Sequence, residues 1–224
     1  MKALLLGSIG VLTDTSELQR RSYNRAFATH GVPVEWSRQE YRELLKKSGG
    51  RERVKRALEA TGSDASASAI HATKTSLHHQ MLRMTSSGCR EGVAQTVRAA
   101  CREGISVGFV TTTSRENVDA VLASVQANLP QDCFDIVLDL SSVSSPKPSP
   151  EVYQLAAAQL GVEPWECVAV EDNVDGVRSA VAAGMQCFAF PGENNAGHDF
   201  SIAVDVLTSL DLSKLKSPAT ELAT

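Results

Sequence analysis

Hydrophobic and polar positions follow two different patterns along the chain, and the change comes near residue 89. The first six residues are almost uniformly apolar, as in a buried strand of a parallel sheet. Residues 15–88 instead carry helix start and stop signals, such as the capping box of Ser37 and Glu40, and contain no strand candidate. This block predicts four helices, over residues 15–31, 37–47, 51–61 and 65–87.

After residue 89, short apolar runs alternate with helical segments, which is typical of βαβ units with parallel strands and right-handed crossovers. The runs predict strands over residues 105–110, 134–138, 167–170 and 186–190. The segments between them predict helices over residues 92–102, from 114, from 149 and over 174–183. We therefore expect an α/β fold, with a Rossmann-like parallel-sheet core from residues 1–14 and 89–224 and an inserted four-helix cap domain from 15–88. The polar tail beyond Ser213 is expected to fray.

Composition and charge narrow the function classes. Of 224 residues, 42% are hydrophobic and 21% are charged, and the formal net charge is -4. Because the chain lacks a basic excess, we expect no nucleic-acid and no membrane partner, and a small molecule or a protein fits better. No run approaches the roughly 18 apolar residues of a membrane span. Five scattered cysteines without metal-site spacing indicate reduced thiols, so a cytoplasmic location is expected.

The carboxyl ends of the strands are where an open α/β sheet places its ligand crevice. The first strand ends at Gly7, Ser8 and Ile9, which offer no carboxylate, amine or imidazole. Another strand ends at Thr111 and Thr112 before a helix, so hydroxyls and free backbone amides there are able to hold a phosphate. A plain helix cap at Ser114 is the alternative explanation of this segment.

Two later segments carry charged groups that suit a phosphate site. Lys147 stands between two prolines, which fix φ and keep the preceding residues extended, so the lysine is presented at a set position. An ordinary loop lysine is the alternative. Glu171 and Asp172 end a further strand with two carboxylates, the oxygen ligands that Mg²⁺ prefers. An acidic helix cap would explain Asp172 or Asn173 alone.

Together these segments resemble the haloacid dehalogenase-like (HAD) phosphohydrolases. The first motif of that family reads Asp-x-Asp-Gly-Val-Leu. Its first aspartate attacks phosphorus to form an aspartyl phosphate, and its second moves protons to and from the leaving oxygen. At those two positions this chain has Gly7 and Ile9, so the resemblance implies that no catalytic pair is intact. The rest of the motif fits at Gly10, Val11, Leu12 and Asp14.

The resemblance also assigns roles to the other strand ends. Thr111 matches the second motif, Lys147 matches the lysine that neutralises phosphate in the third, and Glu171 with Asp172 matches the metal-binding fourth. Family members also draw on the first-motif aspartate to hold Mg²⁺. Because Gly7 stands at that position here, the resemblance implies weak or absent Mg²⁺ binding.

The helical block resembles the CbbY-type, phosphoglucomutase-like branch, phosphatases that act on sugar bisphosphates. Its loop Gly49-Gly50-Arg51-Glu52-Arg53 is similar to the Gly-Gly-Lys-Glu-Arg of that branch, and Arg51 keeps the cation. Glu17 and Arg21 match residues near the substrate, with exposed helix charges as the alternative for each. His78 and His79 are adjacent, face different sides of a helix, and are interpreted as surface residues.

These observations favour a pseudoenzyme that binds an inorganic anion or a phosphorylated metabolite without metal, through Lys147, Thr111, Thr112 and the cap residues. Loss of a nucleophile costs about 10⁶ in rate, which argues against the family reaction. One alternative is a hydrolase with relocated chemistry, using Asp14, Ser8 or a metal-bound water. Asp14 lies seven residues past Gly7, up to about 23 Å along an extended chain. A protein-interaction module with an unused cleft is the other alternative.

Overall fold

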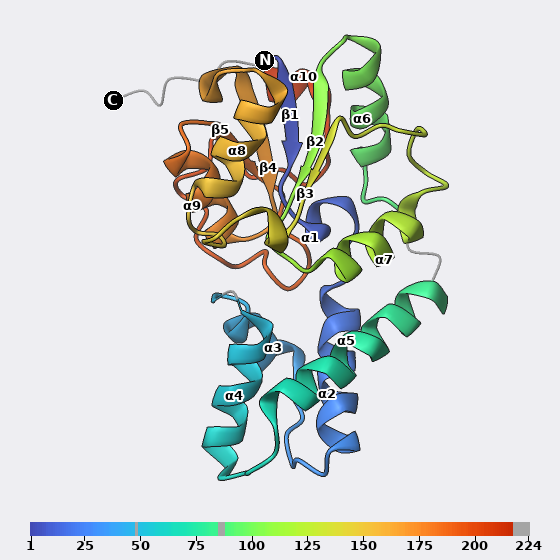
Figure 1. The fold of residues 1–224 in the computed structure, drawn as a ribbon, viewed down its shortest axis with the longest axis vertical. Coiled ribbons are helices and arrows are strands. Elements are labelled where there is room, and N and C mark those ends of the chain that lie inside the picture. Colours follow the sequence, from blue (N-terminus) through green and yellow to red (C-terminus); the bar gives the residue numbers. More distant parts are fainter. Residues whose placement is uncertain (48, 85–87, 217–224) are drawn as a thin grey trace.

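The computed structural model describes residues 1–47, 49–84 and 88–216. Its centre is a five-stranded, fully parallel sheet in the order β3-β2-β1-β4-β5 (Figure 1). This topology confirms the predicted α/β fold with its parallel sheet. The strands are β1 (Ala3–Leu6), β2 (Ser106–Val110), β3 (Ile136–Leu138), β4 (Cys167–Glu171) and β5 (Gln186–Ala189).

Strand β1 is the middle strand and is buried on both faces. Leu6 is level with Phe109 of β2 and Val170 of β4, so the three strands end at one edge. Side chains alternate between the faces, with Leu4 and Leu6 in one apolar cluster and Ala3 and Leu5 in the other. Burial on both faces explains why the strand is a continuous apolar run.

Helices cover both faces of the sheet. Residues of α6, α7 and α10 pack in the cluster on one face, and residues of α8 and α9 pack in the other. In the described part of the chain, no helix is long and apolar enough to cross a membrane. The helices outside the cap are α1 (Ile9–Leu12), α6 (Val93–Arg102), α7 (Arg115–Val125), α8 (Glu151–Leu160), α9 (Val174–Ala182) and α10 (Leu212–Lys216), with 3-10 turns η1 (Leu140–Ser142) and η2 (Pro164–Glu166).

Two predictions about these helices were wrong. The tail does not fray directly after residue 213, because α10 runs to Lys216 and buries Leu212 and Leu215 on one side. Residues 217–224 lie outside the described part. The helix predicted from residue 149 begins at Glu151, with Pro150 as its N-cap.

Helices α2 to α5, which come between α1 and α6 in the chain, form a separate layer below the sheet in Figure 1. We call them the cap, and the rest of the chain the core. The cap packs around its own cluster, which includes Tyr23, Phe27, Trp36 and Tyr41, and the described residues of 15–88 form no strand. The exact domain boundaries stay a prediction. The cap helices are α2 (Ser16–Thr29), α3 (Arg38–Leu44), α4 (Gly50–Thr61) and α5 (Ala67–Met84).

Helix α5 contacts both α2 of the cap and α7 of the core. Its two packed sides explain a further error, because His78 is only 2% exposed and is not a surface residue. His79 reaches the core, where its Nε2 lies 2.7 Å from Asn117 Oδ1. Helix α5 therefore contacts both parts of the molecule.

Arg90 forms hydrogen bonds that connect the two chain segments between cap and core to each other and to the loop after β5. Its backbone N–H donates to Leu12 O at 2.9 Å. Its guanidinium donates to the carbonyl oxygens of Gly10, Phe190 and Pro191 at 2.6 to 2.7 Å. One side chain thus ties the segment leaving β1 to the segment leaving β5.

Candidate functional site

Lys147 lies at the edge where the central strands end. Its Nζ donates to the carbonyl oxygens of Gly7 at 2.5 Å and Val110 at 2.7 Å, and to Glu171 Oε1 at 2.5 Å. An ammonium group has three hydrogens, so these contacts account for all of them. Lys147 therefore joins the ends of β1, β2 and β4, and the interpretation as an ordinary loop lysine is wrong.

Glu171 is the partner that compensates this charge. Its side chain is fully buried, and Oε1 also accepts a hydrogen bond from the Tyr153 hydroxyl at 2.7 Å. Burial raises the pKa of the Glu171 carboxyl, while Lys147 acts in the opposite direction. Burial and the neighbouring Glu171 raise the pKa of the Tyr153 hydroxyl. The lysine, the carboxylate and the phenol thus form one buried network around Glu171 Oε1, whereas Glu171 Oε2 has no hydrogen-bond partner among the described residues.

The same network fills the space beside Gly7. A Cβ atom on Gly7 would lie 2.1 Å from the Tyr153 hydroxyl and 2.3 Å from Glu171 Oε1, closer than real Cβ contacts. Ile9 opens α1 and packs, partly buried, against the core cluster. The end of β1 therefore supplies carbonyl groups and an apolar side chain, and no carboxylate.

Asp172 has separate partners. Its Oδ1 accepts from Ser8 Oγ at 2.7 Å and from Asn173 Nδ2 at 2.8 Å. Asn173 also caps α9 by accepting from the Gly176 N–H at 2.9 Å. A Cβ on Gly10 would lie 1.9 Å from Asp172 Oδ2, so glycine is needed where α1 approaches β4. The helix-cap interpretation is right for Asn173, whereas Asp172 binds the end of β1.

Mg²⁺ is the ion that the family resemblance implies, and the oxygens as they lie do not fit it. Glu171 Oε1 is occupied by Lys147 and Tyr153, and Oε2 is buried without a partner. A Cβ on Gly176 would lie 2.3 Å from that Oε2, so backbone encloses it. Among the described residues, no three His, Cys, Asp or Glu side chains are grouped as metal ligands.

The threonines at the end of β2 lie beside this network. Val110, whose carbonyl accepts from Lys147, precedes Thr111, which is buried. The Thr111 hydroxyl accepts from the Thr113 N–H at 3.3 Å, and Thr112 is half-buried. Ser114 is the N-cap residue of α7, but its side chain makes no capping hydrogen bond. The segment therefore leads into a helix N-terminus, as predicted.

The predicted cap residues are not joined to Lys147. Glu17 pairs with Arg20 at 2.6 Å and with Arg38 at 3.7 Å, while Arg21 and Arg51 are exposed. None of the contacts found within residues 1–47, 49–84 and 88–216 links Glu17, Arg21 or Arg51 to the Lys147 network. Their roles at a ligand stay predictions.

Sequence analysis missed a second buried lysine, in the cap. Lys74 of α5 is 5% exposed, and its Nζ donates to Gln19 Oε1 at 3.0 Å and lies 4.7 Å from the centre of the Tyr23 ring. The Arg53 guanidinium lies 6.0 Å from the centre of the same Tyr23 ring, and Lys74, Arg51 and Arg53 all act on the pKa of His71. The sequence does single out this lysine, because Lys74 is the one charged residue between positions 65 and 82, apart from histidines. We call Arg51, Arg53, His71 and Lys74 the cap basic cluster.

No carboxylate within residues 1–47, 49–84 and 88–216 forms an ion pair with a member of the cap basic cluster. Burial, with an added effect from Arg53, lowers the pKa of Lys74 to about 7. Burial also lowers the pKa of His71, with added effects from Lys74, Arg51 and Arg53. The cap as a whole also has more basic than acidic residues. Residues 15–84 hold 13 of the 22 Lys and Arg residues but only 7 of the 26 Asp and Glu residues.

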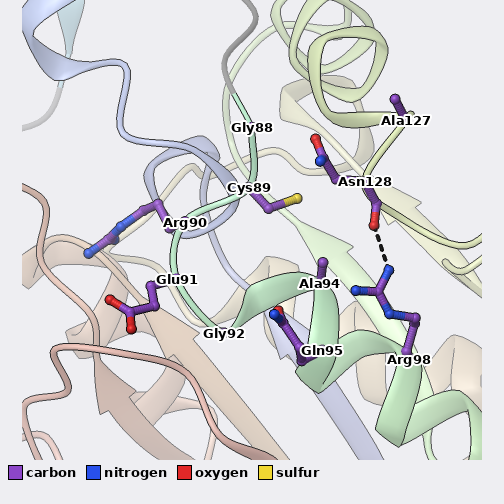
Figure 2. Close-up of a pocket in the computed structure, with 10 residues that line it drawn as sticks. All are labelled: Gly88, Cys89, Arg90, Glu91, Gly92, Ala94, Gln95, Arg98, Ala127 and Asn128. Carbon is purple, nitrogen blue, oxygen red and sulfur yellow. Dashed lines mark hydrogen bonds between the residues drawn. The ribbon is translucent and has the colours of Figure 1, made fainter.

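A separate pocket of about 380 Å³ lies at the start of α6 (Figure 2). Arg98 on its rim is already used, because it donates to the Asn128 carbonyl at 2.8 Å. Figure 2 shows the Arg90 side chain pointing away from the Cys89 thiol, toward the loop that follows β5. This pocket contains none of the predicted site residues.

The chain is similar to known proteins over most of its length. The family described as haloacid dehalogenase-like hydrolase matches residues 1–184. Protein CbbY of Rhodobacter capsulatus is 36% identical over 206 residues, which cover 91% of each chain. The crystal structure of CbbY from Rhodobacter sphaeroides in complex with phosphate is 35% identical, with a TM-score of 0.84, and covers 93% of this chain and 94% of that one. The structure of a CbbY mutant from the same organism, in complex with xylulose-(1,5)bisphosphate, matches equally well. As its motifs predicted, the chain belongs to the haloacid dehalogenase-like hydrolases, among relatives of CbbY.

Proposed function

We propose that this protein binds a phosphorylated metabolite, of the sugar-bisphosphate class, and does not hydrolyse it. The observation that carries the proposal is at Gly7, the position that aligns with the family's nucleophile. It has no side chain, and the Tyr153 hydroxyl and Glu171 Oε1 fill the space where one would begin. Ile9, at the position of the acid-base residue, is apolar. Loss of a nucleophile costs about 10⁶ in rate, and loss of a general acid-base residue about 10²–10⁴ more.

Relocated chemistry has less support, because the alternative groups are engaged elsewhere. Asp14 accepts hydrogen bonds from Ser16 Oγ at 2.6 Å and from the Glu193 N–H at 2.7 Å. Ser8 donates to Asp172. These contacts make Asp14 a structural residue of the segment between core and cap.

Anion binding is supported by the distribution of positive charge. The cap basic cluster offers four basic side chains, and Thr111 and Thr112 lie near the N-terminus of α7, where backbone amides favour anions. Two CbbY structures were solved in complex with phosphate and with xylulose-(1,5)bisphosphate. Lys147 stays part of the proposed site, but Glu171 compensates its charge, so the cap supplies most of the attraction.

The test combines calorimetry with a phosphate-release assay. We expect purified protein to bind xylulose 1,5-bisphosphate and inorganic phosphate equally well with and without EDTA, and to release no phosphate when Mg²⁺ is added. Arg51→Ala should weaken binding about tenfold, because it removes a charged partner of the anion. Arg25→Ala, which removes an exposed arginine of α2, is the matched control and should bind like wild type.

Robust phosphate release would overturn the pseudoenzyme proposal and favour the relocated hydrolase. Absence of binding to either ligand would overturn anion binding and leave the interaction module. A strict Mg²⁺ requirement for binding would show that Glu171 and Asp172 rearrange to hold the metal.

A further inference from the structure

Lys74 is surrounded by neutral and basic groups on every element packed against it. Helix α2 presents Gln19 and Tyr23, and helix α4 brings Arg53, while the exposed Arg51 of α4 acts on His71. On its own helix, His71 and His78 are the titratable neighbours. Among the residues that the structure describes, no carboxylate pairs with the Lys74 amine.

Such an environment disfavours the charged form of a lysine. A buried ammonium loses its hydration, and one neutral amide oxygen and one aromatic ring replace only part of it. The nearby guanidinium of Arg53 adds repulsion. A dianion placed among these groups would reverse both effects, because an opposite charge within about 4–6 Å favours the charged form.

We propose that an anion bound at the cap basic cluster draws one proton from solvent onto the Lys74 amine, so that binding and protonation are coupled. This inference rests on the proposed function. In the bound state an N–H bond forms on Lys74, and the proton comes from the buffer acid, which becomes its conjugate base. Affinity falls about tenfold for each unit of pH above the pKa of free Lys74, because one proton is taken up for each anion.

The probe for this coupling is sulfate, which carries two charges and does not titrate near neutral pH. Calorimetry at pH 8 in two buffers of different ionisation enthalpy measures the protons taken up. We expect about one proton per sulfate for the wild type. Lys74→Arg, whose guanidinium stays charged, should bind sulfate with no proton uptake and with little pH dependence. Lys55→Arg, an exposed lysine of α4 paired with Glu59 at 3.8 Å, is the matched control and should keep the uptake.

Several outcomes would overturn the coupling. Equal heats of wild-type binding in both buffers would show that no proton is taken up. Unchanged uptake in Lys74→Arg would assign the proton to another group, such as His71. Thermal unfolding of each variant checks that it is folded.

A measurement on the free protein separates this inference from the proposed function. Carbon NMR of the Lys74 ε-methylene should show titration well below the value of about 10.4 for an unperturbed lysine. Ordinary titration of Lys74 would refute the coupling even if anions bind. Titration near neutral pH without binding of sulfate or xylulose 1,5-bisphosphate would overturn the proposed function together with the coupling.

Discussion

Lys147 in the core and Lys74 in the cap are both buried, with 8% and 5% of their surface exposed, yet their surroundings are opposite. Lys147 has a carboxylate at 2.5 Å and two carbonyl oxygens, which satisfy its charge and its hydrogens. Lys74 has an amide oxygen, an aromatic ring and basic neighbours. The core lysine therefore has a compensating carboxylate, whereas the cap lysine has none among the described residues.

Removal of the Glu171 carboxylate in the core should cause the largest loss of folding stability. Glu171→Ala leaves Lys147 buried without its counter-ion, and breaking a buried pair from one side costs about 3–5 kcal/mol. Urea unfolding at pH 7 measures this loss. Glu59→Ala removes a carboxylate from an exposed pair and should change stability by less than about 0.5 kcal/mol. Similar small losses for both variants would mean that Lys147 is not isolated from water.

Removal of the charged group of Lys74 in the cap should increase the stability of the protein, whereas removal of the Glu171 carboxylate decreases it. Lys74→Met removes an uncompensated buried amine and should stabilise the free protein by about 1–3 kcal/mol at pH 6. The folded pKa of Lys74 is about 7, below the unfolded value of about 10.4. The unfolded state therefore binds more protons between these values, and wild-type stability gains from this group as pH rises.

Urea unfolding of wild type and Lys74→Met across pH 6 to 10 tests this sign. The advantage of the variant should shrink as pH rises through that window. A variant that is less stable than wild type at pH 6 would show that Lys74 is compensated after all.

An added methyl group at Gly7 probes how tightly the core network is closed. Gly7→Ala places a Cβ 2.1 Å from the Tyr153 hydroxyl, and such overpacking costs about 1–3 kcal/mol. Tyr153→Phe in the same chain removes that hydroxyl and should recover part of the loss. Gly197→Ala, where a Cβ meets nothing within 4 Å, is the control. Strictly additive effects of the first two substitutions would mean that the groups do not collide.

Contacts between cap and core should matter least for stability. Glu193 of the core lies 3.4 Å from Arg38 and 3.8 Å from Arg42 of α3, and all three side chains are about half exposed. Glu193→Gln should therefore cost about 0–1 kcal/mol, and less at high salt, as measured by thermal unfolding at two salt concentrations. A loss above 2 kcal/mol would show that cap and core depend on this contact.

Much of the fold could be predicted from local signals. The apolar run before Gly7 gave the central strand, and the capping box at Ser37 is present in the structure. The two prolines around Lys147 pointed to a lysine held at one place, and it lies at the strand ends. These features depend on neighbours a few residues away in sequence.

The errors came from contacts between distant segments. The pairing of Lys147 with Glu171 spans 24 residues and depends on the room that Gly7 leaves. His78 was interpreted as exposed because helix periodicity does not reveal that α5 packs against two partners. Lys74 was overlooked because no motif surrounds it, and its importance comes from its burial where α5 packs against α2.

The two ends of the cap meet at one hydrogen bond, from the Arg90 N–H to Leu12 O at 2.9 Å. The chain thus leaves the core and re-enters it at nearly the same point. The cap between these two points therefore places no strain on the sheet. The Arg90 guanidinium then fixes that point to the loop after β5. The strand register is therefore set by contacts outside the cap, and the cap is topologically an insertion at a single junction.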